Sequence, residues 1–330
     1  MAEKIILAVD VLGGDDAPQV VLEGISSALT EDQDLEIIAC GPAEIVETFS
    51  HNHNRCHAKV TTEHISMDEH PAEAVRKKKD SSLVVGCRLV KEGQAQGFFS
   101  AGSTGACLAA GTLIMGRIKG VSRPALCTVL PSPVRPVVMC DGGANADCKP
   151  EYLVQFAQMA SIYAEKIIDI ANPQAALLNI GEEDTKGSIF TQEAFELMKN
   201  QLPNFAGNAE GNDILAAKFD VFVTDGFTGN VCLKTIEGTS KVLFKALKEV
   251  FYKSALTKLG ALTIQGGLKE LMSQVSADTY GGAPLLGVKG ACIVGHGSSS
   301  PKAIKNGIHT TARLVRMNVS GLIADVVSKP

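Results

Sequence analysis

Short apolar segments alternate with longer amphipathic segments along this sequence, and this alternation limits the possible folds more than any other feature. The apolar segments have the length of buried strands and are Ile5–Val9, Glu36–Cys40, Gly97–Ser100, Leu126–Leu130, Val137–Cys140, Ala175–Asn179, Val221–Thr224 and Ala291–Val294. Helical spacing of apolar residues fills most intervals, for example Ala17–Leu29, Ala72–Lys91 and Glu151–Ile168. Alternating strands and helices are typical of βαβ units, so we predict an α/β fold around a mostly parallel sheet.

Glycine-rich loops follow several of these strands. They are Gly13–Pro18, Gly102–Gly105, Gly142–Asn145, Gly226–Gly229 and His296–Ser300. Two of them share the pattern Gly-x-Thr-Gly, in SAGSTGA (residues 100–106) and DGFTGN (residues 225–230). A glycine turn that leads into a helix points backbone N–H groups outward at the positive end of the helix dipole. We therefore predict that these loops bind an anion, such as phosphate or a developing oxyanion, at the carboxyl ends of the strands.

The composition argues against a nucleic acid as the main partner. The net charge is −5, there is no tryptophan, and aromatic residues make up 5% of the chain. Nucleic-acid-binding surfaces need basic patches and aromatic stacking platforms, so an anionic ligand must here be held by a local arrangement.

The remaining composition is that of a cytoplasmic globular protein. No apolar run approaches the roughly 18 residues that span a bilayer, and the N-terminus lacks the apolar core of a signal peptide. The nine cysteines form no Cys-x-x-Cys pair, as expected in a reducing compartment. The 330 residues contain no low-complexity linker, and we predict a single catalytic domain over residues 1–330.

The helix that follows DGFTGN carries the most informative candidate. Asn230 stands after the second glycine, where its amide could donate to a phosphate or carbonyl oxygen; the alternative is an ordinary helix-start asparagine. Thr104 and Thr228 could be hydroxyl donors to a ligand or helix caps. The companion backbone positions are Gly102, Ser103, Gly105, Gly226 and Gly229.

Three further loops carry polar candidates. In LLNIGEEDTKG (residues 177–187), Asn179 ends a strand and Lys186 is a candidate phosphate or carbonyl ligand. Asn145 could orient a ligand or hold its own loop. His296 lies just beyond a strand, with Lys302 a few residues later, and we rank it above the other histidines as a candidate.

Other reactive side chains are weaker candidates. Cys107 and Cys232 follow the two Gly-x-Thr-Gly loops, but no histidine stands near them in sequence, so a packing role is favoured over a nucleophile. The cluster His51–His57 lacks a carboxylate at suitable spacing, and we predict no metal site.

Residues 240–275 read as a projecting amphipathic helical hairpin. Its glycine-broken tip presents Leu256, Leu259, Leu262 and Ile264. We predict dimer packing for the bodies of the helices and interfacial membrane contact for the tip.

Together these motifs resemble the PlsX-type phosphate acyltransferases. The resemblance rests, in order along nearly the whole chain, on VDVLGGDDAP, MDEHPAEAVRKKKDSS, SAGSTGA, GGANADCKPE, LLNIGEEDTKG, DGFTGNVCLKTIEG, YGGAPLLG and HGSSSPKAIKN. The chain departs from the family pattern at Val11-Leu12, at Ser103, where the family has asparagine, and at Gly142 and Ala146, where it has larger apolar residues.

The resemblance implies an enzyme that converts fatty acyl-[acyl carrier protein] and inorganic phosphate to acyl phosphate, without a cofactor. It also implies a Rossmann-like fold related to isocitrate and isopropylmalate dehydrogenases and to phosphotransacetylases. A homodimer is expected, with peripheral membrane contact and a downstream membrane glycerol-phosphate acyltransferase as partner in phospholipid synthesis.

These expectations combine into a site hypothesis. Lys186 and Asn230 contact the phosphate or the oxyanion, backbone N–H groups after Gly102 and Gly226 share that charge, and His296 and Lys302 line the pocket. The alternatives are an acetyl-phosphate-forming subunit of an amino-acid reductase complex, a nicotinamide-dependent dehydrogenase, and a non-catalytic scaffold that binds acyl carrier protein. The dehydrogenase lacks support because no acidic signature for an adenosine ribose is found.

Overall fold

The computed structural model describes residues 4–254, 257, 260–261, 263–264, 266–267 and 277–328. Within these residues the strands form one 11-stranded sheet in the order β3-β2-β1-β4-β11-β10-β5-β6-β9-β7-β8. The strands are β1 Ile5–Asp10, β2 Leu35–Gly41, β3 Cys56–Val60, β4 Gly97–Ser100, β5 Ala125–Leu130, β6 Val137–Cys140, β7 Ala175–Leu178, β8 Phe205–Ala209, β9 Val221–Val223, β10 Ala283–Leu286 and β11 Ala291–Val294. The predicted α/β class with a mostly parallel sheet is confirmed.

The sheet consists of two parallel groups joined by antiparallel pairs. Strands β3, β2, β1, β4 and β11 are mutually parallel, and so are β6, β9, β7 and β8. Between the groups, β10 is antiparallel to both β11 and β5, and β5 is antiparallel to β6. The second group therefore runs opposite to the first, a reversal that was not predicted from the sequence.

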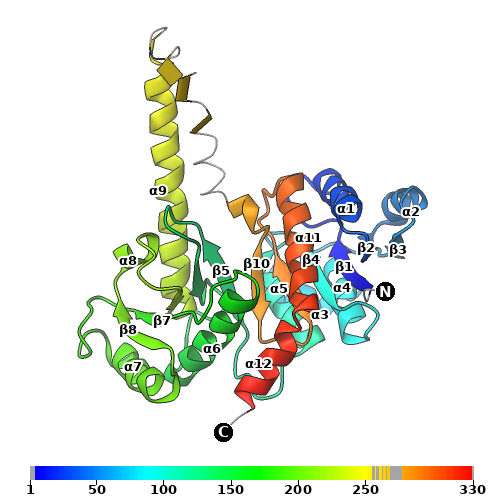
Figure 1. Cartoon of the computed structure of the whole chain (residues 1–330). Helices are drawn as coiled ribbons and strands as arrows, with labels where there is room; N and C mark the ends of the chain where they lie inside the picture. The colour runs from blue at the N-terminus through cyan, green and yellow to red at the C-terminus, as the bar shows by residue number, and fades with distance from the viewer. Residues whose placement is uncertain are drawn as a thin grey trace.

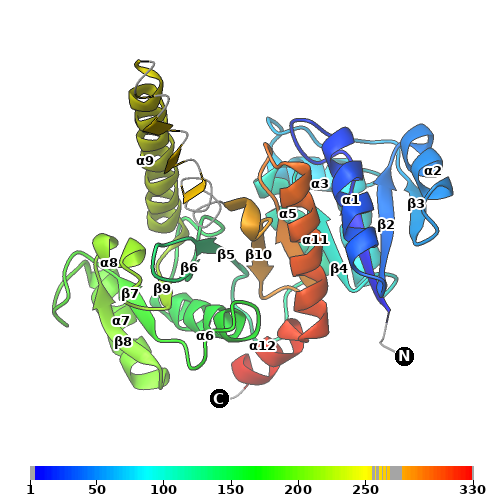
Figure 2. The ribbon, with the colours of Figure 1, turned by 45° about the horizontal axis from the view of Figure 1, so that its top comes forward.

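Helices cover both faces of the sheet (Figures 1 and 2). They are α1 Gln19–Glu31, α2 Ala43–His51, α3 Pro71–Lys77, α4 Ser82–Lys91, α5 Thr104–Ala110, α6 Pro150–Lys166, α7 Ile189–Gln201, α8 Gly211–Leu215, α9 Gly226–Tyr252, α11 Pro301–Arg316 and α12 Val319–Val327. A π-helical turn, η1 Gly111–Met115, continues α5, and a 3-10 turn, η2 Ala277–Thr279, precedes β10.

Alternate residues of β1 show how one strand supplies two cores. Leu7 and Val9 are buried with residues of α1 and α11, whereas Ala8 is buried with residues of α4. Successive side chains of a strand point to opposite faces, so α1 and α11 cover one face of the first strand group and α4 covers the other. The near-continuous apolar sequence of β1 follows from burial on both faces.

The predicted helix Ala72–Lys91 is wrong as a single element, because the chain forms two helices there. Helix α3 ends at Lys77, and α4 begins at Ser82. The Oγ of Ser81 accepts a hydrogen bond from the N–H of Val84 at 3.4 Å. This N-cap starts a new helix, which the apolar spacing alone did not reveal.

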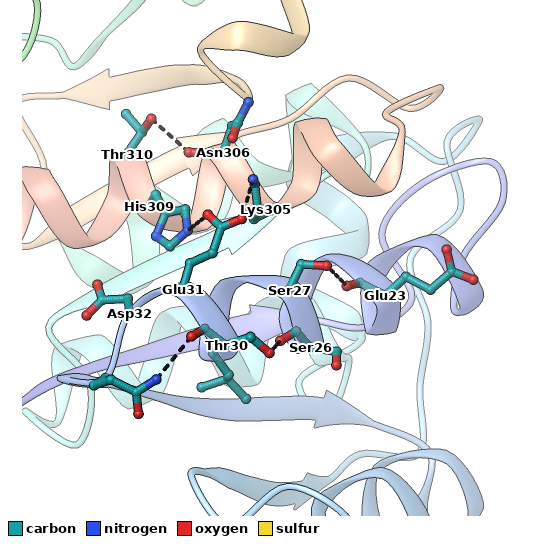
Figure 3. Close-up of polar contacts among 12 residues, drawn as sticks. Glu23, Ser26, Ser27, Thr30, Glu31, Asp32, Lys305, Asn306, His309 and Thr310 are labelled. Atoms are coloured by element: carbon teal, nitrogen blue, oxygen red, sulfur yellow. Dashed lines mark hydrogen bonds and ion pairs between the residues drawn. The ribbon is translucent and has the colours of Figure 1, made fainter.

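Helices α1 and α11 lie side by side and are joined by polar contacts (Figure 3). The Glu31 carboxylate accepts a hydrogen bond from Lys305 Nζ at 2.7 Å and contacts His309 Nε2 at 3.2 Å. The hydrogen bond from Lys305 is the main reason that the pKa of Glu31 lies below its usual range. This pairing connects the first helix of the chain to α11, near the other end of the sequence.

Helix α9 begins at the sheet and projects away from the body of the molecule (Figure 1). It is 27 residues long, and its outer half exposes Val242, Leu243 and Val250. Leu256, Leu259 and Leu262 of the predicted tip lie outside the described residues, whereas Ile264 is described and exposed. No helix in the described part of the chain is long and apolar enough to cross a membrane.

Candidate active site

A cavity of about 270 Å³ lies where the two parallel strand groups meet. It brings together four of the glycine-rich loops, represented by Thr104, Gly142, Asn230 and His296. Its remaining wall residues are Leu126, Thr128, Val129, Gly143, Leu233, Lys234, Glu237, Asp278, Tyr280, Gly281, Gly282, Ala283, Val294, Gly295, Ser299 and Ala303. Loops from both halves of the sheet thus share one concave site.

The loop that follows β6 is organised by a buried carboxylate. Asp141 accepts hydrogen bonds from the backbone N–H groups of Leu126, Gly143, Ala144 and Asn145, and from Nδ2 of Asn145, at 2.8–3.1 Å. Burial raises the pKa of Asp141, and these hydrogen bonds oppose that effect. The carboxylate therefore fixes the turn that places Gly142 and Gly143 in the cavity wall.

The start of α9 packs closely against this loop. The N–H of Gly226 donates to the carbonyl of Asn145 at 2.8 Å, and a Cβ at Gly229 would lie 1.9 Å from the carbonyl oxygen of Asp141. Only glycine at position 229 permits this approach of helix to loop. Asn230 therefore lies directly beside this loop. Its Oδ1 is 3.4 Å from the position that a Cβ at Gly143 would occupy.

The first turn of α9 is capped from within the chain. The Asp225 carboxylate accepts hydrogen bonds from the N–H of Thr228 at 2.9 Å and from its hydroxyl at 2.7 Å. Thr228 therefore serves the helix cap, one of the two roles left open by its position in the sequence. Asn230, in contrast, is exposed and lines the cavity.

His296 reaches the cavity from the loop after β11. The ring Nδ1 of His296 accepts a hydrogen bond from the backbone N–H of Ser298 at 3.2 Å. The backbone N–H of His296 donates to Oγ of Ser299 at 3.1 Å. A backbone N–H can only donate, so the neutral ring carries its proton on Nε2. The imidazole can thus present an N–H donor from a fixed loop.

The loop after β4 rests on a second buried carboxylate. Ser100 Oγ donates to Oδ2 of Asp10 at 2.7 Å and accepts from the N–H of Gly102 at 3.0 Å. Burial raises the pKa of Asp10, and hydrogen bonds from Ser82 and Ser100 oppose that effect. Ser103 caps α5 by accepting from the N–H of Ala106 at 3.4 Å, and Thr104 faces the cavity.

Several predicted site residues lie outside this cavity. Lys186 is exposed, with its Nζ 4.0 Å from Glu183 Oε1, and Lys302 is exposed in the first turn of α11. Asn179 holds the loop of Lys186 by donating to the carbonyl of Lys186 at 3.1 Å. Asn179 and Thr228 line a separate cavity of about 210 Å³.

Asn145 contributes to the frame of the site. Its Nδ2 donates to the carbonyl of Pro124 and to Oδ2 of Asp141, both at 2.8 Å. Loop support was one of the two roles that its sequence position allowed. The geometry supports the role in holding the loop, because Asn145 Nδ2 makes both hydrogen bonds to other residues of the protein.

Lys234 and Glu237 also line the cavity, although neither was predicted as a site residue from the sequence. Both lie on the face of α9 that lines the cavity, and Lys234 follows Asn230 by four residues. Residues four apart in a helix share a face, so the position of Asn230 could have indicated Lys234. Tyr280 and the following glycines, which also line the cavity, gave no comparable signal.

The cysteines are poor nucleophiles in this environment. Burial raises the pKa of Cys107 well above its usual range and also raises that of Cys232. Thiols that stay protonated at neutral pH are unreactive. Within the ranges that the structure describes, no three His, Cys, Asp or Glu side chains are grouped so that they could hold a metal ion.

The sequence is similar to curated bacterial enzymes over nearly its whole length. It matches the family described as "Fatty acid synthesis protein" over residues 5–322. It is 49% identical over 324 residues to a phosphate acyltransferase of Desulfitobacterium hafniense strain Y51, covering 97% of this chain and 96% of that protein. The corresponding enzyme of Halothermothrix orenii is 45% identical over 329 residues, with 98% of each chain covered.

Solved structures show the same fold at low sequence identity. A phosphotransacetylase from Streptococcus pyogenes superposes with a TM-score of 0.62 at 18% identity, covering 96% of this chain and 95% of that one. A branched-chain phosphotransacylase from Enterococcus faecalis V583 superposes with a TM-score of 0.60 at 16% identity, covering 94% and 99%. At these identities the likeness concerns the fold.

The fold and the full-length relatives define the class of the protein as an acyl-transferring enzyme. The chain belongs to the fatty acid synthesis protein family, the PlsX-type phosphate acyltransferases.

Proposed function

We propose that the protein transfers a fatty acyl group from acyl carrier protein to inorganic phosphate, and so supplies acyl phosphate for glycerophospholipid synthesis. The observation that carries this proposal is the convergence of Asn230, His296 and Thr104 on one cavity in a member of this family. Loops from separate strands place an amide, an imidazole and a hydroxyl there. Such donors can orient phosphate and a thioester carbonyl without a covalent intermediate.

The chemistry needs a positioned nucleophile and oxyanion stabilisation. A phosphate oxygen attacks the thioester carbonyl carbon, a C–O bond forms, and the carbonyl oxygen becomes an oxyanion. The oxyanion then collapses, the C–S bond breaks, and the carrier leaves as a thiolate. A thiolate is a good leaving group, so a strong general acid is dispensable. Positioning and one oxyanion donor contribute several kcal/mol each, roughly 7 and 3–4.

We assign the donors by their placement. The Nδ2 of Asn230 and the Nε2–H of His296 donate to the oxyanion or to phosphate, and the Thr104 hydroxyl assists. Lys186, on a loop, and Lys302, in the first turn of α11, do not line the cavity, and their contact with the substrate stays a prediction.

One assay tests the function against its alternatives. Acyl-phosphate formation from acyl carrier protein thioester and phosphate should proceed without a nicotinamide cofactor. Long acyl chains should be preferred over acetyl, since acetyl preference would favour a subunit of a reductase complex. Binding of acyl carrier protein without turnover would favour a scaffold, and either result would contradict the proposal.

We also propose that the protein is a homodimer joined through α9. The exposed apolar residues of its outer half, Val242, Leu243, Leu247 and Val250, are spaced as one helical face. Exposed faces of this kind mark interaction sites. Sedimentation should give a dimer for the native chain and a monomer for Leu243→Glu; a native monomer would contradict this.

Peripheral membrane contact is proposed for the tip beyond α9. The support is the apolar character of Leu256, Leu259 and Leu262 in the sequence and the exposure of Ile264. This placement would bring acyl phosphate near a membrane glycerol-phosphate acyltransferase. A variant with glutamate at the three leucines should lose flotation with anionic liposomes; unchanged flotation excludes the tip.

A further inference from the structure

One face of α9 contributes a charged pair to the cavity. Asn230, Leu233, Lys234 and Glu237 follow one another at intervals of three, one and three residues, which places them on one side of the helix. Among the described residues that line the cavity, Lys234 is the only lysine or arginine. A dianionic substrate in this cavity therefore has one permanent cation available from the wall.

The cation already has an anionic partner. Lys234 Nζ donates to Glu237 Oε2 at 2.8 Å, and the two side chains are 52% and 33% exposed. Ion pairs at such exposed positions are weak, because water screens both charges. Phosphate carries more charge than a carboxylate and offers more acceptor oxygens, so it can replace Glu237 as the partner of the ammonium group.

The other acidic wall residue, Asp278, has a partner on a different element. Its carboxylate accepts a hydrogen bond from the Ser300 hydroxyl at 2.9 Å. Lys186 and Lys302, the cations suggested by the sequence, are not part of the wall. In the described part of the cavity wall, the ion pair of Lys234 is with Glu237, one turn along α9.

We propose that Lys234 binds the incoming phosphate and that Glu237 competes with phosphate for the Lys234 ammonium group, which sets the affinity of the enzyme for phosphate. This inference rests on the proposed function for the identity of the anion. The inference predicts that substitutions of Lys234 and Glu237 change the affinity for phosphate in opposite directions. Removing the cation weakens phosphate binding, and removing the competing carboxylate strengthens it.

A ³¹P NMR titration of the full-length protein with inorganic phosphate, without an acyl donor, measures phosphate affinity and tests the proposal. Glu237→Gln should bind phosphate about threefold more tightly, the factor expected for loss of an exposed ion pair. Lys234→Met should bind it about tenfold or more weakly, and Lys234→Arg should recover part of the loss. In the double variant Lys234→Met/Glu237→Gln, the Glu237→Gln change should no longer strengthen phosphate binding, because the ammonium group for which Glu237 and phosphate compete is absent.

Turnover and matched controls complete the test. In steady-state kinetics the KM for phosphate should follow these affinities, with little change in the KM for the acyl donor. Lys241→Met and Glu249→Gln change the same charges farther along α9, away from the cavity, and should leave both values unchanged. Phosphate affinity that is equal in the native protein, Glu237→Gln and Lys234→Met overturns the inference. Absence of turnover in the native protein contradicts the proposed function, while the binding titration still decides this point.

Discussion

The carboxylate of Asp141 accepts two hydrogen bonds from Asn145, one from its backbone N–H and one from its Nδ2, both at 2.8 Å. This pair closes the loop after β6 upon itself. The carbonyl of Asn145 then accepts the N–H of Gly226, the first residue of α9. The helix that carries Asn230 is therefore positioned by a buried carboxylate in the loop after β6.

Replacing Asn145 with alanine should destabilise the protein. The change removes the Nδ2 donor from both the Pro124 carbonyl and Asp141. A buried acceptor that loses its partner costs about 1–3 kcal/mol. Urea unfolding should show this loss for Asn145→Ala and almost none for Asn212→Ala, which changes an exposed asparagine of α8. Equal unfolding midpoints in the two variants would contradict the role of this pair.

Two glycines of α9 should respond in opposite ways to alanine. A Cβ at Gly229 would lie 1.9 Å from the Asp141 carbonyl oxygen, so Gly229→Ala must displace the start of the helix. We expect a loss of at least about 2 kcal/mol in unfolding free energy, together with most of the activity. Among the described residues outside the local helix backbone, nothing lies within 4 Å of a Cβ at Gly238, and Gly238→Ala should stabilise the helix by about 0.5–1 kcal/mol. A Gly229→Ala protein as stable and active as the native enzyme would disprove the close approach.

The strands and their loops could be predicted because burial on both faces leaves continuous apolar runs. Strand direction could not be read from those runs, since apolar character has no polarity along the chain. One signal was available: only residues 131–136 connect β5 to β6, too short a link for a parallel crossover. Strands β3, β8 and β10 escaped prediction; in β3 four of the five residues are exposed, so the apolar signal of a buried strand is missing.

Candidate site residues on glycine-rich loops could be predicted from the sequence, whereas those placed by the orientation of a helix could not. Glycine turns after strands pointed to Thr104, Asn230 and His296, which share the cavity. A lysine in a glycine-bounded loop looked equally promising, yet Lys186 lies elsewhere. Lys234 was not predicted as a site residue, and only the orientation of α9 gives it a place in the wall.

Asn230→Ala should lower turnover without lowering stability. The side chain is exposed and faces the cavity, so its removal leaves no buried group unpaired. If it donates to the oxyanion, kcat should fall about 10²–10³-fold. Thermal melting should match that of the native protein. Thr235→Ala, an exposed change on the same helix outside the cavity wall, serves as the control, and a kcat for Asn230→Ala as high as that control would remove Asn230 from the mechanism.

The contact between α1 and α11 should give stability a defined pH dependence. Because Lys305 and His309 contact Glu31, the pKa of this carboxyl is lower in the folded protein than in the unfolded chain. Such a group stabilises the fold at pH values above its unfolded pKa of about 4.3, and the contribution is lost as the pH falls through the folded value. Glu31→Gln should therefore lower Tm at pH 7 by at most about 2 °C, since the Glu31 side chain is 53% exposed and water screens its charge. The difference from the native protein should shrink progressively below about pH 4.

Glu23→Gln on the same helix is the matched control, because Glu23 contacts Gln19 and no cation is among its hydrogen-bond partners in the described part of the chain. A Tm difference for Glu31→Gln that stays constant from pH 7 to pH 3, or one matched by Glu23→Gln, would show that the ion pair does not stabilise the contact between these helices.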